Sequence, residues 1–261
     1  MSEFMLKMEE RPELKDPVLI EGLPGIGQVG KIAAEYLIER LKARRFALLH
    51  SYDFPPQVLV KMDGVVESMR NEFYYHRGGS RDLILVTGNT QAATNEGQYR
   101  LSEKILDLAE ELGCSMIYTL GGFGVGRNVE KPRVYGAVND EGLIHSLEPL
   151  GVVLERSGVG HIIGASGLLL GLGSLRGMAG ICLMGETSGF YVDPGSAKAV
   201  LEVLTKHLGM DVDLEGLEKR ARDIEKMTAE AAEMEKRILE EMGALTQPEP
   251  MPDKDQMRYI G

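Results

Sequence analysis

Several stretches of the sequence carry residue types that could bind or transform a small molecule. The segment Gly25-x-Gly27-x-x-Gly30 matches the dinucleotide-binding pattern, in which glycines let a backbone approach a pyrophosphate at a helix N-terminus. An acidic residue about 20 positions later would hold the ribose, and Asp53 has this spacing. Pro55-Pro56 and an apparent hairpin follow Asp53, where that fold requires a helix and a parallel strand. The glycines are therefore more simply interpreted as a tight structural turn.

The same segment also approaches the phosphate-binding loop of nucleotide hydrolases, because Lys31 directly follows Gly30. In that loop the next residue supplies a hydroxyl group to magnesium. Here the next residue is Ile32, which has no ligand atom. The sequence therefore argues against nucleotide hydrolysis.

The segment Gly164-Ala165-Ser166-Gly167-Leu168 resembles a nucleophile elbow, in which a serine stands between two glycines on a sharp turn. Leu168 replaces the last glycine of that pattern, and no strongly apolar strand directly precedes the segment. His145 and His161 are near in sequence, which says little about their geometry. A helix cap or a hydrogen-bonded surface group is the simpler interpretation of Ser166.

Asn89, Glu186 and Asp193 each follow an apolar run that reads as a core strand. If these side chains converge in a closed pocket, the chain is a small-molecule enzyme that binds a nucleotide or nucleoside at a glycine-lined edge of the sheet. The alternative for Asp193-Pro194 is structural, because an aspartate before a proline caps a helix well.

The elements that must position these residues follow an α/β pattern. Apolar strands are predicted near residues 18–21, 46–52, 83–88, 116–122 and 180–185, and helices over 29–41, 95–112 and 196–208. Asp63-Gly64 is predicted to turn a hairpin between 58–62 and 65–75. Near-continuous apolar strands that alternate with helices predict a largely parallel sheet covered on both faces.

Composition limits the possible partners. The chain has 261 residues and a formal net charge of −11, which disfavours nucleic-acid binding. Cys114 and Cys182 lack metal-ligand spacing, so we expect buried thiols, no metal and no cofactor. No apolar run is long enough to cross a membrane and the N-terminus is not signal-like, so a cytoplasmic location without membrane contact is expected.

The sequence divides into four parts: a mobile N-terminal arm over 1–16, an α/β domain over 17–210, an amphipathic helix over 211–245, and a spacer with a terminal peptide over 246–261. The helix has an apolar seam with spacings of three and four. This seam either packs on its own domain or joins copies of the chain. The candidates for an oligomer contact are Leu217, Ile224, Met227, Met234 and Ile238.

The proline-rich spacer ends in a pentapeptide that is unusually apolar for a disordered tail. The pentapeptide either folds back on the domain or docks into the pocket of a partner. The residues assigned to docking are Met257, Arg258, Tyr259, Ile260 and Gly261.

Five features occur in an order that resembles the archaeal form of the proteasome assembly chaperone family. They are the glycine turn 22–30 with Ala33 and Leu37 behind it, the strand end 120–124, the loop 164–173, the segment 185–194 and the ending 258–261. The resemblance covers residues 15–261.

The resemblance implies a three-layer α/β/α sandwich with a mostly parallel central sheet, similar to nucleoside phosphorylase-like folds but without an established catalytic centre. It also implies a homo-oligomer that binds proteasome α-subunits or the core particle. In such proteins a hydrophobic residue, a tyrosine and a final residue insert between α-subunits. Tyr259 would have this role, although it is third from the end and Arg258 occupies the hydrophobic position, so the tail could instead serve self-association.

Overall fold

The computed structural model describes residues 4–154 and 160–219, which belong to one compact unit. The strands are β1 (Phe4–Met8), β2 (Val18–Glu21), β3 (Arg44–Ser51), β4 (Val58–Val60), β5 (Val66–Ser68), β6 (Asn71–His76), β7 (Leu83–Gly88), β8 (Met116–Gly124), β9 (Val134–Val138) and β10 (Ala179–Thr187). The α-helices are α1 (Val29–Leu41), α2 (Asn95–Glu111), α3 (Ile144–Leu147), α4 (Ala165–Leu175) and α5 (Pro194–Leu208), and short 3₁₀ turns are η1 (Ile26–Gln28), η2 (Glu141–Leu143) and η3 (Glu148–Leu150).

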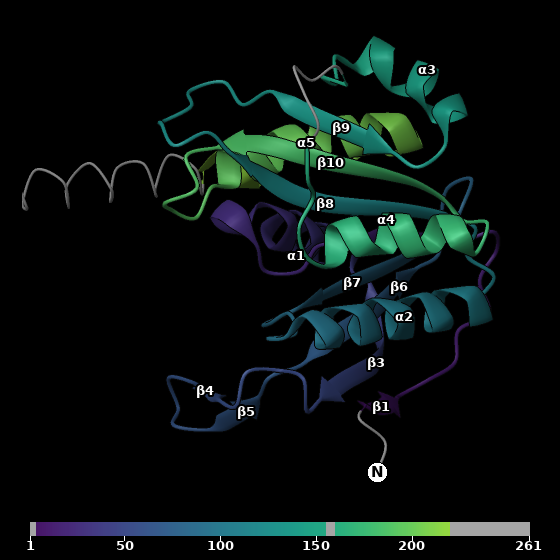
Figure 1. The fold of residues 1–261 in the computed structure, drawn as a ribbon, viewed down its shortest axis with the longest axis vertical. Coiled ribbons are helices and arrows are strands. Elements are labelled where there is room, and N and C mark those ends of the chain that lie inside the picture. The colour runs from purple at the N-terminus through teal and green to yellow at the C-terminus, as the bar shows by residue number, and fades with distance from the viewer. Residues whose placement is uncertain (1–3, 155–159, 220–261) are drawn as a thin grey trace, which may run out of the picture. The chain divides into compact units, whose positions relative to one another are not determined.

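An eight-stranded mixed sheet forms the middle layer, in the order β1-β3-β6-β7-β2-β8-β10-β9 (Figure 1). The four strands β7, β2, β8 and β10 are parallel to one another, and the remaining pairings are antiparallel. The α/β class is confirmed, but the parallel part is confined to the centre. The connections from β3 to β6 and from β6 to β7 contain no crossover helix, so these strands return antiparallel.

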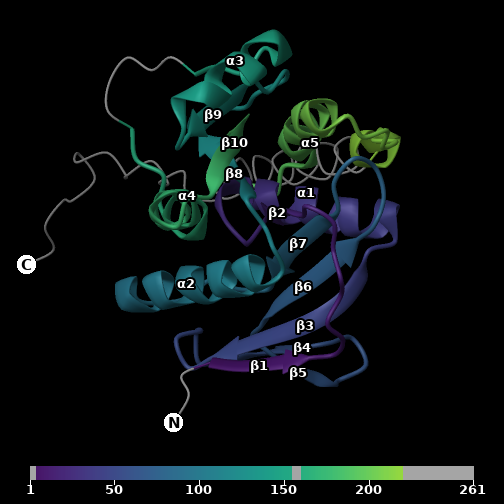
Figure 2. The same cartoon turned by 90° about the vertical axis from the view of Figure 1, so that its right-hand side faces the viewer.

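Helices cover both faces of the central strands. Helices α1 and α5 pack on one face, and α2 and α4 pack on the other (Figure 2). The two helix layers explain why all four residues of β2 are buried. Successive side chains of a strand point to opposite faces. Thus Val18 and Ile20 join the core under α1, and Leu19 joins the core under α2.

The predicted hairpin is confirmed as a separate two-stranded sheet of β4 and β5. Gly64 has a φ of +81°, and the Asp63 carboxylate accepts a hydrogen bond of 3.0 Å from the Val65 backbone N–H. The chain does not continue as one strand to Tyr75. Instead it starts again at Asn71 as β6, which enters the main sheet between β3 and β7.

The N-terminal segment differs from the mobile arm that the sequence suggested. Strand β1 pairs antiparallel with β3 over five residue pairs and forms an edge of the main sheet. Phe4 and Leu6 lie against the core under α2, and Arg45 of β3 donates a 2.9 Å hydrogen bond to Glu9. The strand itself is FMLKM, a short apolar run inside a charged N-terminal segment, and its alternate residues Phe4 and Leu6 supply the contact with the core.

The folded body extends past residue 210. Tyr36 of α1 donates a 2.9 Å hydrogen bond to the backbone carbonyl of Asp213, and Arg40 forms an ion pair with the Asp213 carboxylate. Leu217 is 0% exposed and lies in the core under α1. The rest of the predicted amphipathic helix and the spacer lie outside the described residues.

Candidate functional site

The glycine segment is closed by contacts within the protein. A β-carbon on Gly30 would lie 2.0 Å from the Leu120 carbonyl oxygen, and one on Gly22 would lie 2.1 Å from the Gly30 carbonyl oxygen. Gly27 has a φ of +61°, which favours glycine. These glycines bring α1 against the ends of β2 and β8. Their structure therefore supports the role of a tight turn over that of a pyrophosphate cradle.

The polar residues proposed for a small-molecule pocket have structural partners, beginning with Asp193 and Glu186. Asp193 caps α5 by accepting a 2.8 Å hydrogen bond from the Ser196 backbone N–H. The nearly buried Glu186 carboxylate accepts hydrogen bonds of 2.9 and 3.3 Å from the side chain and backbone of Arg133. These hydrogen bonds hold the pKa of Glu186 below its usual value.

Asn89, the third residue, begins the loop after β7. Its side-chain oxygen accepts a 2.8 Å hydrogen bond from the Arg70 backbone N–H, which fastens the start of β6. Asn89 lines a groove that neither Glu186 nor Asp193 lines. The three residues thus do not form the convergent pocket that the enzyme alternative requires.

Glu21 is a buried carboxyl group that the sequence did not identify. It ends β2, is 0% exposed, and accepts 2.9 Å hydrogen bonds from the Leu23 backbone N–H and the Ser166 hydroxyl. Burial raises its pKa to about 7, against the smaller lowering effect of these two hydrogen bonds. The hydrogen bond from Ser166 therefore connects the first turn of α4 to the end of β2. His145 does not take part in this contact. It lies beside Glu148, with 3.4 Å between its Nδ1 atom and a carboxylate oxygen.

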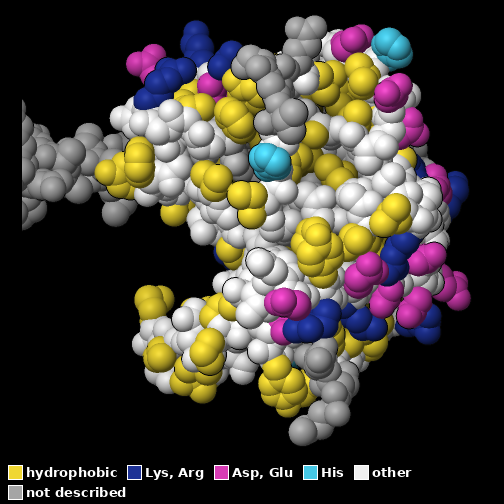
Figure 3. All heavy atoms as spheres, viewed as in Figure 1, with side chains coloured by type: hydrophobic (Ala, Val, Ile, Leu, Met, Phe, Trp, Pro, Cys, Tyr) yellow, Lys and Arg dark blue, Asp and Glu magenta, His cyan; other side chains and the backbone are white. Residues whose placement is uncertain are grey.

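A groove of about 320 Å³ opens between α1, the hairpin and the ends of β6 and β7. We call it the hairpin groove; it is lined by Lys31, Glu35, Ile38, Glu39, Leu59, Glu67, Glu72, Tyr74, Thr87, Gly88 and Asn89. Figure 3 shows this face of the domain hollowed above the hairpin. On this face of the sheet, α1 and α5 cover the parallel strands but leave β6 uncovered. The groove is the space beside α1 that remains open.

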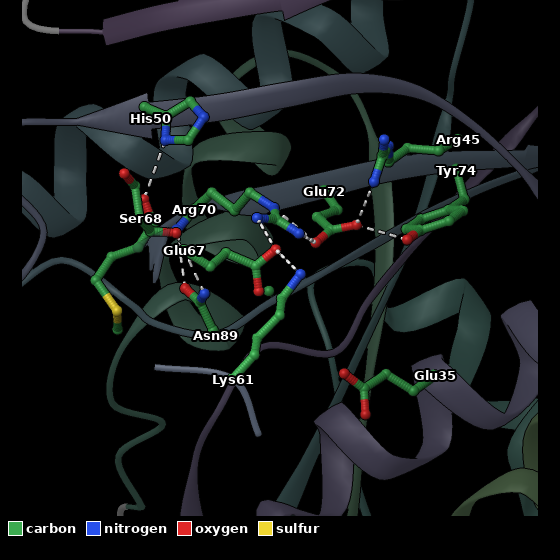
Figure 4. Close-up of polar contacts among 12 residues, drawn as sticks. Glu35, Arg45, His50, Lys61, Glu67, Ser68, Arg70, Glu72, Tyr74 and Asn89 are labelled. Carbon is green, nitrogen blue, oxygen red and sulfur yellow. Dashed lines mark hydrogen bonds and ion pairs between the residues drawn. The ribbon is translucent and has the colours of Figure 1, made fainter. Parts of the chain in front are cut away.

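A network of charged side chains forms the strand wall of the hairpin groove. Glu72 accepts hydrogen bonds of 2.8 Å from Arg70 and 2.6 Å from the Tyr74 hydroxyl, and Arg45 lies 3.4 Å away (Figure 4). Glu67 forms ion pairs with Arg70 and Lys61. The positive and negative charges of this wall therefore largely compensate one another.

The pKa values of the network follow from its geometry. Burial alone would raise the pKa of Glu72, but the hydrogen bond from Tyr74 and the charges of Arg70 and Arg45 outweigh it and lower the pKa. Burial, with the hydrogen bond to Glu72, raises the pKa of Tyr74. The wall therefore keeps Glu72 ionised and Tyr74 protonated near neutral pH.

A second surface lies where the loops after β8 and β10 meet η1. We call it the edge patch; its exposed apolar side chains are Ile26, Phe190, Tyr191 and Val192. The exposed guanidinium groups of Arg127 and Arg133 lie 4.0 and 2.9 Å from Glu186 at the same edge. Exposed aromatic, aliphatic and arginine side chains are enriched in protein–protein interfaces.

The residues predicted for oligomer contacts and docking have different outcomes. Leu217 is a correction, because it packs on its own domain and presents no surface to another copy. Ile224, Met227, Met234 and Ile238 lie outside the described residues, as do Met257, Arg258, Tyr259, Ile260 and Gly261. Both cysteines are buried thiols, and neither forms a disulfide bond.

Within residues 4–154 and 160–219, no group of three or more histidine, cysteine, aspartate or glutamate side chains could hold a metal ion. A search of the same residues finds no helix with the length and apolarity needed to span a membrane.

Comparison with known proteins identifies relatives along nearly the whole chain. MJ1210 of Methanocaldococcus jannaschii is 46% identical over 255 residues, which cover 98% of this chain and 96% of that protein. The crystal structure of Pyrococcus furiosus PbaB, an archaeal proteasome activator, is 44% identical with a TM-score of 0.85, covering 89% of this chain and all of that one. The structure of Pyrococcus furiosus PbaA, an archaeal homolog of proteasome-assembly chaperone, is 30% identical with a TM-score of 0.74, covering 93% of this chain and 97% of that one.

The family model PAC2 matches residues 19–232. This range includes the glycine turn, nearly all of the central sheet apart from its edge strand β1, and both helix layers. Because the match spans most of the chain and the relatives align along nearly their full length, the chain belongs to the PAC2 family.

Proposed function

We propose that this protein is a non-enzymatic, proteasome-associated chaperone or activator that binds proteasome α-subunits or the core particle. The observation that carries the proposal is the similarity to PbaB, an archaeal proteasome activator, at 44% identity over its entire chain. PbaA, a homolog of proteasome-assembly chaperone, supports the same class of partner. The similarity extends over sequence and fold together, which a shared scaffold alone would not require.

A role in protein binding also agrees with the polar groups of the described domain. The segment 22–30 is packed against its own backbone, and Glu186 and Asp193 are engaged in structural hydrogen bonds. The exposed edge patch has the composition of an interface. These features favour binding surfaces over a catalytic cleft.

The contact with the proteasome is proposed to include the C-terminal pentapeptide, residues 257–261. Its sequence ends in Met257, Arg258, Tyr259, Ile260 and Gly261, behind a proline-rich spacer. A proline-rich spacer of this kind would hold the peptide away from the domain. Several such peptides on one oligomer would engage the repeated pockets of a ring with high effective concentration, so weak individual contacts would suffice.

The protein is proposed to act as a homo-oligomer. Of the residues assigned to self-association, Leu217 is excluded by its burial, and the proposal keeps Ile224, Met227, Met234 and Ile238. These four continue the three- and four-residue spacing of a helix seam. Light scattering of the full chain and of a chain that ends at residue 219 tests this part, because loss of the seam should lower the mass of the assembly.

Removal of residues 257–261 tests the tail. The full chain and the truncated chain are each sedimented with the cognate proteasome core particle. We expect the truncation to lower the bound fraction at least about tenfold through loss of avidity, while circular dichroism and the oligomeric mass stay unchanged. A full chain whose last five residues are reversed in order serves as the matched control of composition and should bind as weakly as the truncation.

The outcomes separate the tail from the partner. Equal binding by the full and truncated chains would reject the docking role of residues 257–261 but keep the proteasome as partner. No binding by either chain would reject the proposed function itself.

A further inference from the structure

The edge patch displays a run of large apolar side chains where a core strand ends. The loops after β8 and β10 leave the sheet at the same edge (Figure 1), and the exposed residues of the second loop are Phe190, Tyr191 and Val192. Ile26 of η1 lies beside both loops, because β-carbons added at Gly124 and Gly189 would each lie 3.5 Å from its Cγ2 atom. Contiguous apolar side chains on a surface mark a site of interaction.

Backbone hydrogen bonds hold the loop after β10 at both of its ends. At its start, the Val125 N–H donates a 2.9 Å hydrogen bond to the Thr187 carbonyl. At its end, the Asp193 N–H donates a 2.9 Å hydrogen bond to the Gly27 carbonyl, and the Asp193 carboxylate caps α5. A loop that is held in this way loses less conformational entropy when a partner binds to it.

Two arginines converge on one carboxylate at the same edge. The Nη2 atoms of Arg133 and Arg127 lie 2.9 and 4.0 Å from the same oxygen, Oε1 of Glu186. The Arg133 guanidinium also lies over the Tyr135 ring, 5.3 Å from its centroid. The Arg127 and Arg133 side chains are 70% and 58% exposed, whereas the Glu186 side chain is 3% exposed. A partner at this edge therefore meets the two guanidinium groups, and the carboxylate lies beneath them.

The remaining charges of these loops leave that positive excess in place. Glu130 and Lys131 are exposed neighbours of opposite sign in the loop after β8, so they cancel formally. The Asp193 carboxylate accepts a hydrogen bond at the N-terminus of α5, where the helix dipole balances its charge. The two arginines share the single carboxylate of Glu186, which leaves one positive charge uncompensated. Figure 3 shows basic and apolar side chains together at this edge.

The combination of charge and apolar surface determines which kind of ligand fits. Guanidinium groups bind carboxylates through paired, charge-assisted hydrogen bonds. The apolar side chains of residues 190–192 would be covered by apolar side chains of a peptide, whereas a nucleic-acid backbone would leave them in water. The edge patch is therefore complementary to a protein segment that carries both carboxylates and large apolar residues.

We propose that the edge patch binds an acidic segment of a partner protein that also carries large apolar side chains. A carboxylate of the segment accepts hydrogen bonds from Arg127 and Arg133, and an apolar side chain of the segment covers Phe190 and Tyr191. Glu186 is a positioning residue, because it holds the Arg133 guanidinium in place. This binding does not depend on the proteasome, which is absent from the test.

The test titrates the full-length protein into the peptide acetyl-Leu-Asp-Trp-Asp-Leu-amide at low salt. The chain contains no tryptophan, so the fluorescence of the peptide reports binding without interference from protein tryptophan. We expect saturable binding with a blue shift of the tryptophan emission. The peptide in which both aspartates are replaced by asparagine should bind at least about tenfold more weakly, because it has lost the charge-assisted hydrogen bonds to the arginines.

Two variants and two matched controls locate the site. Arg127→Gln should weaken binding of the acidic peptide about three- to fivefold, and Phe190→Ser at least about tenfold, through loss of an exposed charge pair and of buried apolar area. Arg11→Gln is the control for the charge, because Arg11 is also 70% exposed and paired with one glutamate, in this case Glu111 on α2. Tyr52→Ser is the control for the aromatic ring, because Tyr52 is 71% exposed in the loop after β3. Both controls should bind as the wild type does.

All four substitutions are at exposed side chains, so their melting temperatures should match that of the wild type. If Phe190→Ser fails to fold, Arg127→Gln and the comparison of the two peptides still decide the outcome. Equal binding of the aspartate and asparagine peptides, or no saturable binding, would overturn the proposal. A short oligothymidylate that displaces the peptide as effectively as its phenylalanine analogue would overturn the assignment to a protein segment. Loss of assembly mass in Phe190→Ser, without peptide binding by the wild type, would assign the patch to a second copy instead.

Discussion

Glu21 links three parts of the domain at the level of single hydrogen bonds. Glu21 is the last residue of the central strand β2. Its carboxyl group accepts one hydrogen bond from the Leu23 backbone N–H in the following turn and another from the Ser166 hydroxyl in the first turn of α4. No solvent reaches it, and burial raises its pKa from 4.5 to about 7. The folded chain therefore holds the Glu21 proton more tightly than the unfolded chain.

The sign of the resulting pH dependence is specific. The contribution of Glu21 to stability is fully present below its unfolded pKa of 4.5 and decreases as pH rises towards its folded pKa of about 7. Glu21→Gln should remove this decrease, so that at about pH 8 the variant is more stable than the wild type by roughly 2 kcal/mol. Urea unfolding of both proteins at about pH 5 and pH 8 measures the difference.

Glu186 provides the control of opposite sign. The hydrogen bond and charge of Arg133 lower its pKa, so its contribution is present above its unfolded pKa and is lost on acidification. Glu186→Gln should therefore destabilise the protein near neutral pH. If the unfolding free energies of the wild type and Glu21→Gln differ by the same amount at about pH 5 and about pH 8, the pKa of Glu21 is not raised on folding.

The glycines at the end of β2 allow a second test at the residue scale. Gly30→Ala would place a β-carbon 2.0 Å from the Leu120 carbonyl oxygen, so α1 would have to move away from the sheet. We expect a loss of about 3 kcal/mol in unfolding free energy. Gly25→Ala is the matched control. Gly25 has an extended backbone with a φ of −159°, and the nearest atom to an added β-carbon is the Leu23 carbonyl oxygen, 4.0 Å away. A Gly30→Ala variant as stable as Gly25→Ala would contradict a packing role for Gly30.

Local patterns predicted single residues well where their partners are near in sequence. The turn at Asp63-Gly64 and the cap formed by Asp193 depend on neighbours within three residues; the turn was predicted, and the cap was one of the two interpretations that the sequence left open for Asp193. Glu21 was missed because its partner Ser166 is 145 residues away. Leu217 was assigned to an oligomer contact because a seam of apolar residues does not specify whether it faces the same chain or another.

At the scale of elements, periodicity predicted the central strands and the helices α1, α2 and α5, because long apolar runs and helical spacing are strong signals. The turn residues Asp63 and Gly64 predicted the hairpin, which the pairing of β4 with β5 confirms. Strand β1 was missed because it is an edge strand in which no side chain is fully buried: two of its five residues are half-buried and three are exposed. The antiparallel direction of the outer strands was not predicted, because it depends on which strands lie side by side in the sheet, and the local sequence pattern does not specify strand order.

Strand β1 should contribute measurably to stability. Deletion of residues 1–9 removes its five pairs with β3 and the Glu9 partner of Arg45, and it leaves β3 as an unpaired edge. We expect a decrease of about 1–3 kcal/mol in unfolding free energy and increased aggregation. Deletion of residues 1–3 alone is the control and should have no effect. If both deletions unfold at the same urea concentration as the wild type, the pairing of β1 contributes nothing to stability.

At the scale of the whole molecule, the described domain offers two surfaces and a body that supports them. The edge patch combines exposed apolar side chains with two arginines, and the hairpin groove is lined by both acidic and basic side chains. The glycine turn and the buried Glu21 hold the elements that carry these surfaces in place.

The most direct test of the central proposal is a binding isotherm of the full-length protein with the purified cognate proteasome core particle, followed by sedimentation velocity. Saturable binding with a dissociation constant of about 1 μM or below is the expected result, with several copies bound to each end of the core particle. A fully folded protein that forms no complex with the core particle or its isolated α-subunits at concentrations of about 100 μM would contradict the proposed function.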